Sequence, residues 1–376
     1  MANVTGMHLD LGGIFVENST YSYEDYVYKE DCPSEVGTGL HFGTVFLPML
    51  YSLTLFLGLL GNGLVLAVLI QRKQRWSVTD TFILHLAVAD ILLLLTLPFW
   101  AVQAVWGWSF GTPFCKITGA IFTINFYCGI FLLACISLDR YLSVVHGVQM
   151  YSRKKPLMVQ ASCLTVWLFS IFLSIPDWYF LESVNEECVH NYLKLSQSGF
   201  DWRLSSRLLY HIVGFLLPSF VLLFCYSYIL QRLLQGSQGV QKQKVILALA
   251  LVLVFFICWT PYNITLMADT FEGKPEHSEA VAWSCENKRA ALENSLAVTF
   301  ALACLHTCLN PVLYLGLCRN FYCRVLHMVR CAQGVPDHPR LSLWDSSVVV
   351  DTNEQAEENG RLNQIVSIEQ VQSIKR

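Results

Sequence analysis

Residues 115–141 read CKITGAIFTINFYCGIFLLACISLDRY, an apolar run that is closed by the triplet Asp139-Arg140-Tyr141. A helix of about 20 mostly apolar residues crosses a hydrocarbon core of about 30 Å, and this run is long enough to do so. Six further runs of comparable length lie near residues 45–70, 79–103, 157–181, 204–234, 245–268 and 290–317. The sequence therefore predicts an all-α membrane protein, a bundle of seven transmembrane helices.

The composition and the charge distribution agree with this prediction. Apolar residues make up 54% of the chain and charged residues only 14%, whereas soluble proteins carry about 25% charged residues. Acidic residues dominate residues 1–43, while basic residues gather after the first, third, fifth and seventh runs, as in Arg72, Lys73, Arg153, Lys154, Arg232, Lys244, Arg319 and Arg324. By the positive-inside rule, the N-terminus is expected outside the plasma membrane and the C-terminus in the cytoplasm.

Four regions follow from these patterns. We expect an extracellular acidic tail over residues 1–43, a seven-helix bundle over 44–317, a short amphipathic eighth helix over 318–331, and a disordered cytoplasmic tail over 332–376. Asn3 and Asn18 begin Asn-x-Thr/Ser sequons in the outer tail, so both are candidate glycosylation sites. The alternative is that these common tripeptides occur there by chance.

The outer tail also carries four closely spaced tyrosines among acidic residues. This composition suits tyrosine sulfation and the electrostatic attraction of a basic protein ligand. A solvated acidic tail without specific affinity is the alternative, but disordered segments usually contain few aromatic residues. We therefore favour a ligand-docking arm formed by Tyr21, Tyr23, Tyr26 and Tyr28.

Four of the 14 cysteines lie on the outer side of the predicted bundle. Four cysteines allow three pairings. We predict Cys115–Cys188, which would pin the second outer loop to the third helix, and Cys32–Cys285, which would tie the tail to the base of the seventh helix. The sequence alone leaves the other two pairings open.

Polar residues inside the apolar runs are costly and need a partner or a function. Asp90 is the clearest case, and Asn62, His306 and Asn310 are expected to converge on it, around water molecules or a sodium ion. A hydrogen-bonded cluster with a purely structural role is the alternative. No other cofactor or metal site is predicted, and none of the runs shows a nucleophile and base pair or a metal cluster that would indicate an enzyme.

Three motifs occur in order on the third, sixth and seventh runs: Asp139-Arg140-Tyr141, Cys258-Trp259-Thr260-Pro261-Tyr262 and Asn310-Pro311-Val312-Leu313-Tyr314. Together they resemble a class A (rhodopsin-like) G-protein-coupled receptor. The four outer cysteines, the Thr96-Leu97-Pro98 stretch and the acidic, tyrosine-rich tail resemble the CXC branch of the chemokine receptor family.

This resemblance implies roles for individual residues. A switch for coupling to a G protein would involve Asp139, Arg140, Tyr141, Trp259, Pro261, Asn310, Pro311 and Tyr314. The ligand pocket would be lined by Trp100, Tyr127, Asp177, Tyr262, Asp269 and Glu293. The three carboxylates among them would attract the basic N-terminus of a chemokine.

The resemblance also implies the partners. We expect a CXC-type chemokine outside, a heterotrimeric G protein of the Gi/o class inside, arrestin and receptor kinases at the cytoplasmic tail, and membrane lipid around the bundle, with chemotaxis of immune cells as the response. No nucleic-acid partner is expected. The alternative function is a scavenging chemokine receptor that internalises its ligand without signalling, which would typically have a damaged Asp-Arg-Tyr region.

Overall fold

The computed structural model describes residues 42–71, 76–146, 156–192, 201–234, 239–271, 279–329 and Leu343. The chain divides into the units Met1–His41 and Phe42–Arg376, and all described residues belong to the second. The predictions for the tail tyrosines, Asn3, Asn18 and Cys32 therefore lie outside the described residues. For residues 279–290, among them Cys285, only the backbone is described.

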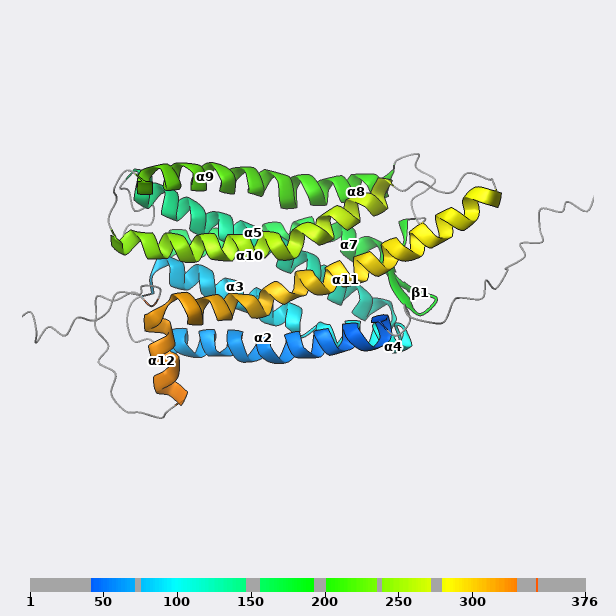
Figure 1. Cartoon of the computed structure of the whole chain (residues 1–376), viewed down its shortest axis with the longest axis horizontal. Coiled ribbons are helices and arrows are strands. Elements are labelled where there is room, and N and C mark those ends of the chain that lie inside the picture. Colours follow the sequence, from blue (N-terminus) through cyan, green and yellow to red (C-terminus); the bar gives the residue numbers. More distant parts are fainter. Residues whose placement is uncertain are drawn as a thin grey trace, which may run out of the picture. The chain divides into compact units, whose positions relative to one another are not determined.

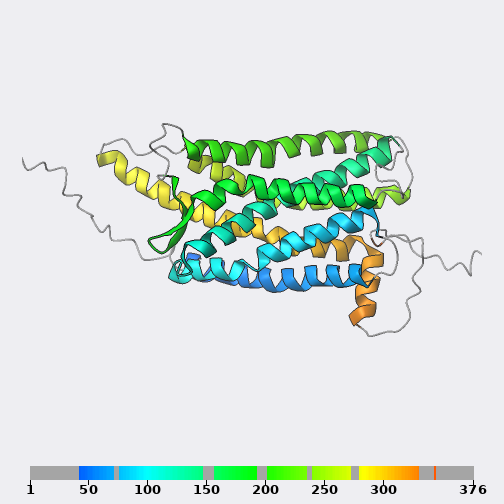
Figure 2. The same cartoon turned by 180° about the vertical axis from the view of Figure 1, so that it is seen from behind.

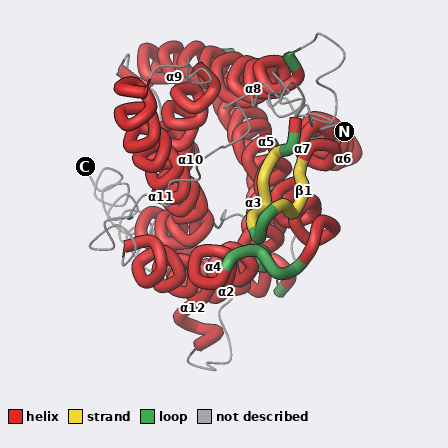
Figure 3. The backbone as a smooth tube through the Cα atoms, turned by 90° about the vertical axis from the view of Figure 1, so that its right-hand side faces the viewer, coloured by secondary structure: helices red, strands yellow, loops and turns green. Residues whose placement is uncertain are grey.

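Within the described ranges, seven helical segments are long and apolar enough to span a membrane, which confirms the predicted fold class. In chain order the segments are η2 (Phe42–Phe46) with α2 (Leu47–Ile70), α3 (Val78–Leu94) with α4 (Leu97–Trp106), α5 (Gly111–Val145), α6 (Pro156–Leu173) with α7 (Ile175–Phe180), α8 (Trp202–His211) with η4 (Ile212–Leu216) and α9 (Leu217–Leu234), α10 (Gly239–Phe271), and α11 (Glu279–Leu317). The long helices run side by side in Figure 1, and Figure 3 shows them end-on.

Several helices extend further than the apolar runs predicted, α5 and α11 among them. α5 continues to Val145, past the Asp139-Arg140-Tyr141 triplet, and α11 begins at Glu279. Hydrophobicity marks only the part of a helix that lies in lipid. The helix itself continues until its backbone N–H to C=O hydrogen bonds are interrupted. The residues around Glu279–Ala290 are rich in Ala, Glu, Lys and Arg, which are strong helix formers.

Prolines inside five of the spans act in different ways. Helical structure breaks at Leu95–Thr96 ahead of Pro98 and at Ser174 ahead of Pro176, and a π-helical turn, η4, precedes Pro218. Pro261 and Pro311 lie inside the continuous helices α10 and α11. Each proline lacks a backbone N–H, so each leaves a carbonyl without its helical partner and permits a bend.

The two ends of the bundle differ. At one end, the hairpin end, β1 (Leu181–Val184) pairs antiparallel with β2 (Glu187–His190), and a disulfide joins Cys188 to Cys115 at the start of α5. At the other end, the α12 end, the short helix α12 (Arg319–Val329) follows α11 directly (Figure 1 and Figure 2). From the last residues of the chain the structure describes only Leu343, which is buried.

Helix α2 packs closely against α11 through a glycine. A Cβ added to Gly61 would come within 2.7 Å of Pro311 Cβ, whereas one added to Gly63 would meet no atom within 4 Å. Small residues at helix interfaces let backbones approach in a membrane, where the hydrophobic effect does not drive helix association. Gly61 therefore sets the position of α2 against the proline of the third motif.

Candidate functional site

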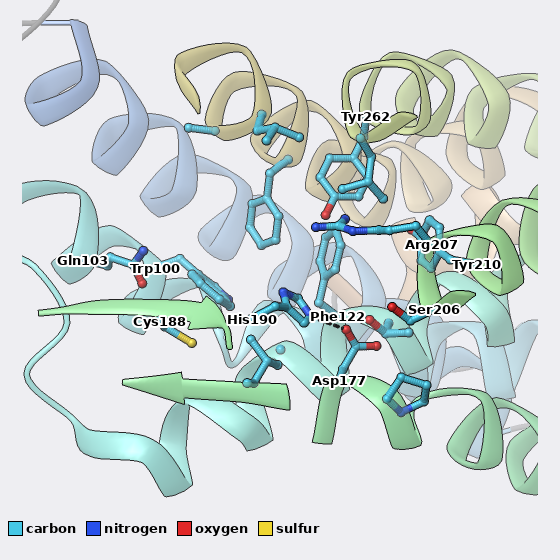
Figure 4. A pocket seen from close by; sticks show the side chains of 18 of the residues that line it. Trp100, Gln103, Phe122, Asp177, Cys188, His190, Ser206, Arg207, Tyr210 and Tyr262 are labelled. Carbon is cyan, nitrogen blue, oxygen red and sulfur yellow. Dashed lines mark hydrogen bonds and ion pairs between the residues drawn. The ribbon is translucent and has the colours of Figure 1, made fainter. Parts of the chain in front are cut away.

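A cavity of about 380 Å³ lies at the hairpin end, between the helices and the β-hairpin. Its wall is mostly apolar and aromatic, as in most ligand sites, and it draws on every spanning segment. Figure 4 shows the polar and aromatic side chains among its lining residues, which include Tyr51, Trp100, Gln103, Phe122, Tyr127, Asp177, His190, Arg207, Tyr210, Tyr262 and Phe300.

Aromatic rings form a continuous surface along part of the cavity. The rings of Phe122 and Phe300 stack with centroids 4.2 Å apart, and Phe300 also packs against Trp100 at 5.1 Å. Phe122 meets Tyr262 edge to face at 5.4 Å. These contacts join α4, α5, α10 and α11, so a ligand that presses on one ring acts on four helices.

The charged groups of the cavity are already partnered in part. Asp177 Oδ1 lies 2.6 Å from Nε2 of His190, which projects from β2. Asp269, at the end of α10, pairs with Arg203 at 3.0 Å and with Arg207 at 3.6 Å. The cavity therefore carries one carboxylate and one guanidinium among its described lining residues, and is less acidic than the sequence predicted.

Several buried polar atoms of this wall have no hydrogen-bond partner. They are Nε1 of Trp100, Oε1 of Gln103, Nε of Arg207 and the hydroxyl of Tyr210. An unpaired buried polar group costs about 1–3 kcal/mol.

Four of the six predicted ligand residues line the cavity: Trp100, Tyr127, Asp177 and Tyr262. Asp269 pairs with Arg203 and Arg207, and Glu293 is exposed. Neither residue belongs to the described lining of the cavity, so both stay predictions as ligand contacts.

Two polar lining residues, Arg207 and His190, were not predicted from the sequence. Arg207 could have been found as a charge inside the fifth apolar run, and His190 as a titratable residue two positions after the predicted disulfide.

Trp259 lies outside the cavity lining and is fully buried. Its ring centroid is 5.1 Å from that of Phe122, which lines the cavity, and 5.4 Å from that of His306. Nδ2 of Asn263 donates to the Trp259 carbonyl at 3.0 Å, and Oδ1 of Asn263 lies 3.2 Å from Nδ1 of His211 on α8. Any influence of a ligand on Trp259 must therefore pass through side chains such as Phe122.

The predicted polar cluster forms around Asp90, which is fully buried. Its carboxylate accepts from Asn310 Nδ2 at 2.9 Å and from Asn125 Nδ2 at 3.2 Å, and Nε2 of His306 lies 3.4 Å away. Asn62 bonds instead to the backbone, donating to the carbonyls of Gly58 and Thr307. The structure adds Asn125, which the sequence analysis did not include in this cluster.

A sodium ion would find oxygen atoms in this cluster. Oδ1 of Asn62 and Oδ1 of Asn125 are buried without a hydrogen-bond partner, and Nδ2 of Asn125 bonds to the Asp90 carboxylate. Carboxylate and amide oxygens are ligands that hard cations prefer. The residues present fit the ion, which stays a prediction.

The α12 end of the bundle is closed around Arg140. The guanidinium pairs with Asp139 and lies 3.5 Å from the Thr79 hydroxyl on α3. The cavity beside it, lined by Arg140 and residues of α3, α5 and α10, measures only about 10 Å³. A partner therefore cannot reach the inner helix faces in this conformation.

Two further predicted switch residues, Tyr141 and Tyr314, lie near this end. Tyr141 packs against Tyr228 and Phe224 of α9, and its hydroxyl lies 3.3 Å from Nε2 of His146. Tyr314 is buried and meets Phe321 of α12 edge to face at 6.1 Å. The tyrosines thus connect α5 with α9 and α11 with α12.

The predicted disulfide between Cys115 and Cys188 is confirmed. It places the hairpin over the cavity, where Leu181, Cys188 and His190 contribute to the lining. Lys116, next to Cys115, donates to the carbonyl of Trp178 at 2.8 Å and so attaches α7 to the same region. The Cys32–Cys285 pairing lies outside the described side chains.

Comparison with known proteins gives two kinds of match. Residues 61–314 match the model of the 7 transmembrane receptor (rhodopsin family). C-X-C chemokine receptor type 3 is 43% identical in Homo sapiens over 310 residues and 42% identical in Bos taurus over 305 residues, each match covering 80% of this chain and 81% of the relative. C-X-C chemokine receptor type 1 of Homo sapiens is 39% identical over 310 residues, which cover 81% of this chain and 87% of the relative.

Proposed function

The chain belongs to the rhodopsin family of seven-transmembrane receptors and, within it, to the chemokine receptors, and on that premise we propose that it binds an extracellular CXC-type chemokine and activates a cytosolic G protein of the Gi/o class. Members of this family are receptors and not enzymes, and the chain is a multi-pass protein of the plasma membrane. The cellular response in this proposal is chemotaxis of immune cells.

The proposal orients the chain with the hairpin end outside. The acidic residues of 1–43 and the basic segments between the spans support this orientation through the positive-inside rule. The cavity then opens toward an extracellular ligand, and the tail with its tyrosines belongs to the extracellular part of the chain. The relatives are named for chemokines of the C-X-C type, which supports that ligand class.

The observation that carries the signalling part is a chain of contacts between the cavity and the polar cluster. Phe122 lines the cavity and packs on Trp259, Trp259 packs on His306, and His306 lies against Asp90. Asn310 of the Asn-Pro-x-x-Tyr motif bonds to the same carboxylate. A ligand that moves the aromatic wall thereby favours a different arrangement of α10 and α11.

Coupling to the G protein requires that the closed α12 end opens. The Asp139–Arg140 pair is intact, which supports signalling over scavenging. A ligand can open this end only if it binds the open bundle more tightly than the closed one. Arrestin and receptor kinases at the cytoplasmic tail, surrounding lipid and a sodium ion near Asp90 are further parts of the proposal.

The test is a panel of CXC chemokines applied to cells that express the full chain. At least one chemokine should trigger a calcium flux and the dissociation of Gi/o subunits, and pertussis-toxin treatment should abolish both. Uptake of a labelled chemokine without dissociation of any G-protein class would overturn the signalling proposal in favour of a scavenger. Absence of binding across the panel would overturn the ligand class.

A further inference from the structure

We propose that the imidazole of His190 occupies the Asp177 carboxylate, the anionic subsite of the cavity, when no ligand is bound. A cationic group of the ligand must displace this imidazole, so that ligand affinity decreases as the pH falls. This inference rests on the proposed function, because it assumes that a chemokine segment enters the cavity. It adds the chemistry that the entering segment needs and the solution condition that regulates its binding.

The geometry places the imidazole on the carboxylate. Nε2 of His190 lies 2.6 Å from Oδ1 of Asp177, and both side chains line the cavity (Figure 4). The two side chains are 27% and 19% exposed, so water and ligand reach them from the cavity while most of their surface is covered. The pair therefore forms part of the binding surface itself.

The backbone holds His190 in this position. His190 pairs with Leu181 in the hairpin ladder, two residues after Cys188, whose disulfide anchors the hairpin to α5. The imidazole also stacks on Tyr192, with centroids 5.7 Å apart and ring planes within 7°. The side chain is thus presented to Asp177 by a rigid element, and leaving the carboxylate requires only a rotation of the side chain.

Asp177 is the subsite that a cation must use. Among the described residues that line the cavity, Asp177 is the one carboxylate. Asp269 lies outside that lining and is neutralised by Arg203 and Arg207, which are permanently charged. The partner of Asp177 is instead a histidine, whose charge depends on pH, so this subsite can be vacated.

The direction of the pH effect follows from this competition. A protonated imidazole holds Asp177 by a charge-assisted hydrogen bond, and a neutral imidazole holds it more weakly. An ammonium or guanidinium of the ligand that binds Asp177 must displace the imidazole. A lower pH favours the charged form of a histidine, which holds the carboxylate more tightly, so acidification opposes binding.

The phenols and guanidinium groups around the pair keep their protonation state between about pH 5.5 and about pH 8. Burial raises the pKa of Tyr192, so its phenol stays neutral. The remaining phenols of the lining stay neutral below about pH 9, and guanidinium groups stay charged. The groups on the elements packed around the pair are Lys116 and Tyr127 of α5, Glu182 of β1, Arg207 and Tyr210 of α8, and Tyr262 of α10.

The experiment compares the full-length receptor with His190→Gln, which keeps a hydrogen-bond donor for Asp177 but carries no charge at any pH. The probe is a fluorescent CXC chemokine that binds in the panel described above. Between about pH 8 and about pH 5.5, we expect the affinity of the unmutated receptor to fall by about threefold or more relative to His190→Gln. Comparing the two receptors at each pH cancels titration of the chemokine itself.

Two controls make the result specific. His146→Gln changes a histidine at the α12 end and should leave the pH dependence of the unmutated receptor in place. A chemokine that lacks its N-terminal segment has no cation to place at Asp177, so the two receptors should respond to pH alike. An affinity ratio between receptor and His190→Gln that is the same at both pH values would overturn the inference.

A measurement without ligand tests the pair independently of the proposed function. In receptor labelled with ¹³C-histidine, the ring signal that disappears in His190→Gln should shift in Asp177→Asn. A signal that is indifferent to Asp177→Asn would show that His190 does not occupy the subsite. Failure of every chemokine to bind at about pH 8 would overturn the proposed function alone, because this measurement still decides the pairing.

Discussion

Arg140 is a permanently charged guanidinium at the end of a bundle whose helices are mostly apolar. It is held by Asp139 on the same helix and approaches Thr79 on the neighbouring α3. The small cavity beside it leaves no room for a partner in this conformation. The residue is therefore positioned to become available only when the helices separate.

We predict that Arg140→Ala abolishes chemokine-driven nucleotide exchange on Gi/o, because the guanidinium is the group that opening would expose. Chemokine binding should remain largely intact, because Arg140 lies at the α12 end and is not among the residues that line the cavity. Exchange is measured with purified G protein, and binding with labelled chemokine on intact cells. Exchange at the unmutated level would contradict the role assigned to Arg140.

Asp139→Asn provides a variant with the opposite expectation. Removal of the counter-charge weakens the restraint on Arg140 without removing the guanidinium. Basal exchange without chemokine should therefore rise, while Arg140→Ala should show none. A decrease in basal exchange for Asp139→Asn would mean that the pair does not restrain the closed state.

At the scale of the helices, the α2–α11 contact is sensitive to a single added carbon. A methyl group on Gly61 would meet the ring of Pro311, which cannot move aside because it is part of the backbone. Overpacking of this kind usually costs about 1–3 kcal/mol. It would also press on the helix that carries Asn310, next to Pro311.

We predict that Gly61→Ala lowers the melting temperature of the purified receptor and weakens signalling, whereas Gly63→Ala does neither. Gly63 is the matched control, because it lies in the same helix and a Cβ there meets no atom within 4 Å. Thermal unfolding in detergent, followed by a thiol-reactive dye, measures the difference. Equal melting temperatures for the two variants would contradict the close packing of α2 on α11.

At the scale of the whole molecule, we predict that the tail and the bundle divide the recognition of a ligand. The cavity is mostly apolar and aromatic and carries few charges, and its one described lining carboxylate has a histidine partner. Long-range attraction of a basic protein must then come chiefly from residues 1–43, where acidic residues and tyrosines alternate.

Replacing Tyr21, Tyr23, Tyr26 and Tyr28 by Phe should lower chemokine affinity by about tenfold at low salt and by less at high salt, because the sulfates expected on these tyrosines are charges that act over a screening length of about 8 Å at physiological ionic strength. Surface expression should not change. Titrations of labelled chemokine at several salt concentrations measure the effect. An affinity that matches the unmutated receptor at every salt concentration would show that the tail is a passive spacer.

The apolar runs, the three motifs and the Cys115–Cys188 pairing were predictable, and the structure agrees with each. Trp100, Tyr127, Asp177 and Tyr262 were also placed in the cavity. The partners of the carboxylates were not predictable, since Asp177 meets His190 from a hairpin and Asp269 meets Arg203 and Arg207 from another helix. The bond from Asn125 to Asp90 was not predicted either, because it too joins residues of different helices.

The sequence by itself determined the number of spans, their approximate ends and the family, because the length of an apolar run and the order of short motifs are linear properties of the chain. Only the tertiary structure decided which polar groups meet and which carboxylate faces the cavity. In a soluble helix, the spacing of apolar residues reveals the buried face. In a membrane helix both the lipid-facing and the buried side are apolar, so apolar spacing does not reveal which side is buried. The rotation of each helix about its axis, the breaks at prolines and close contacts such as Gly61 against Pro311 then decide which polar groups of neighbouring helices meet.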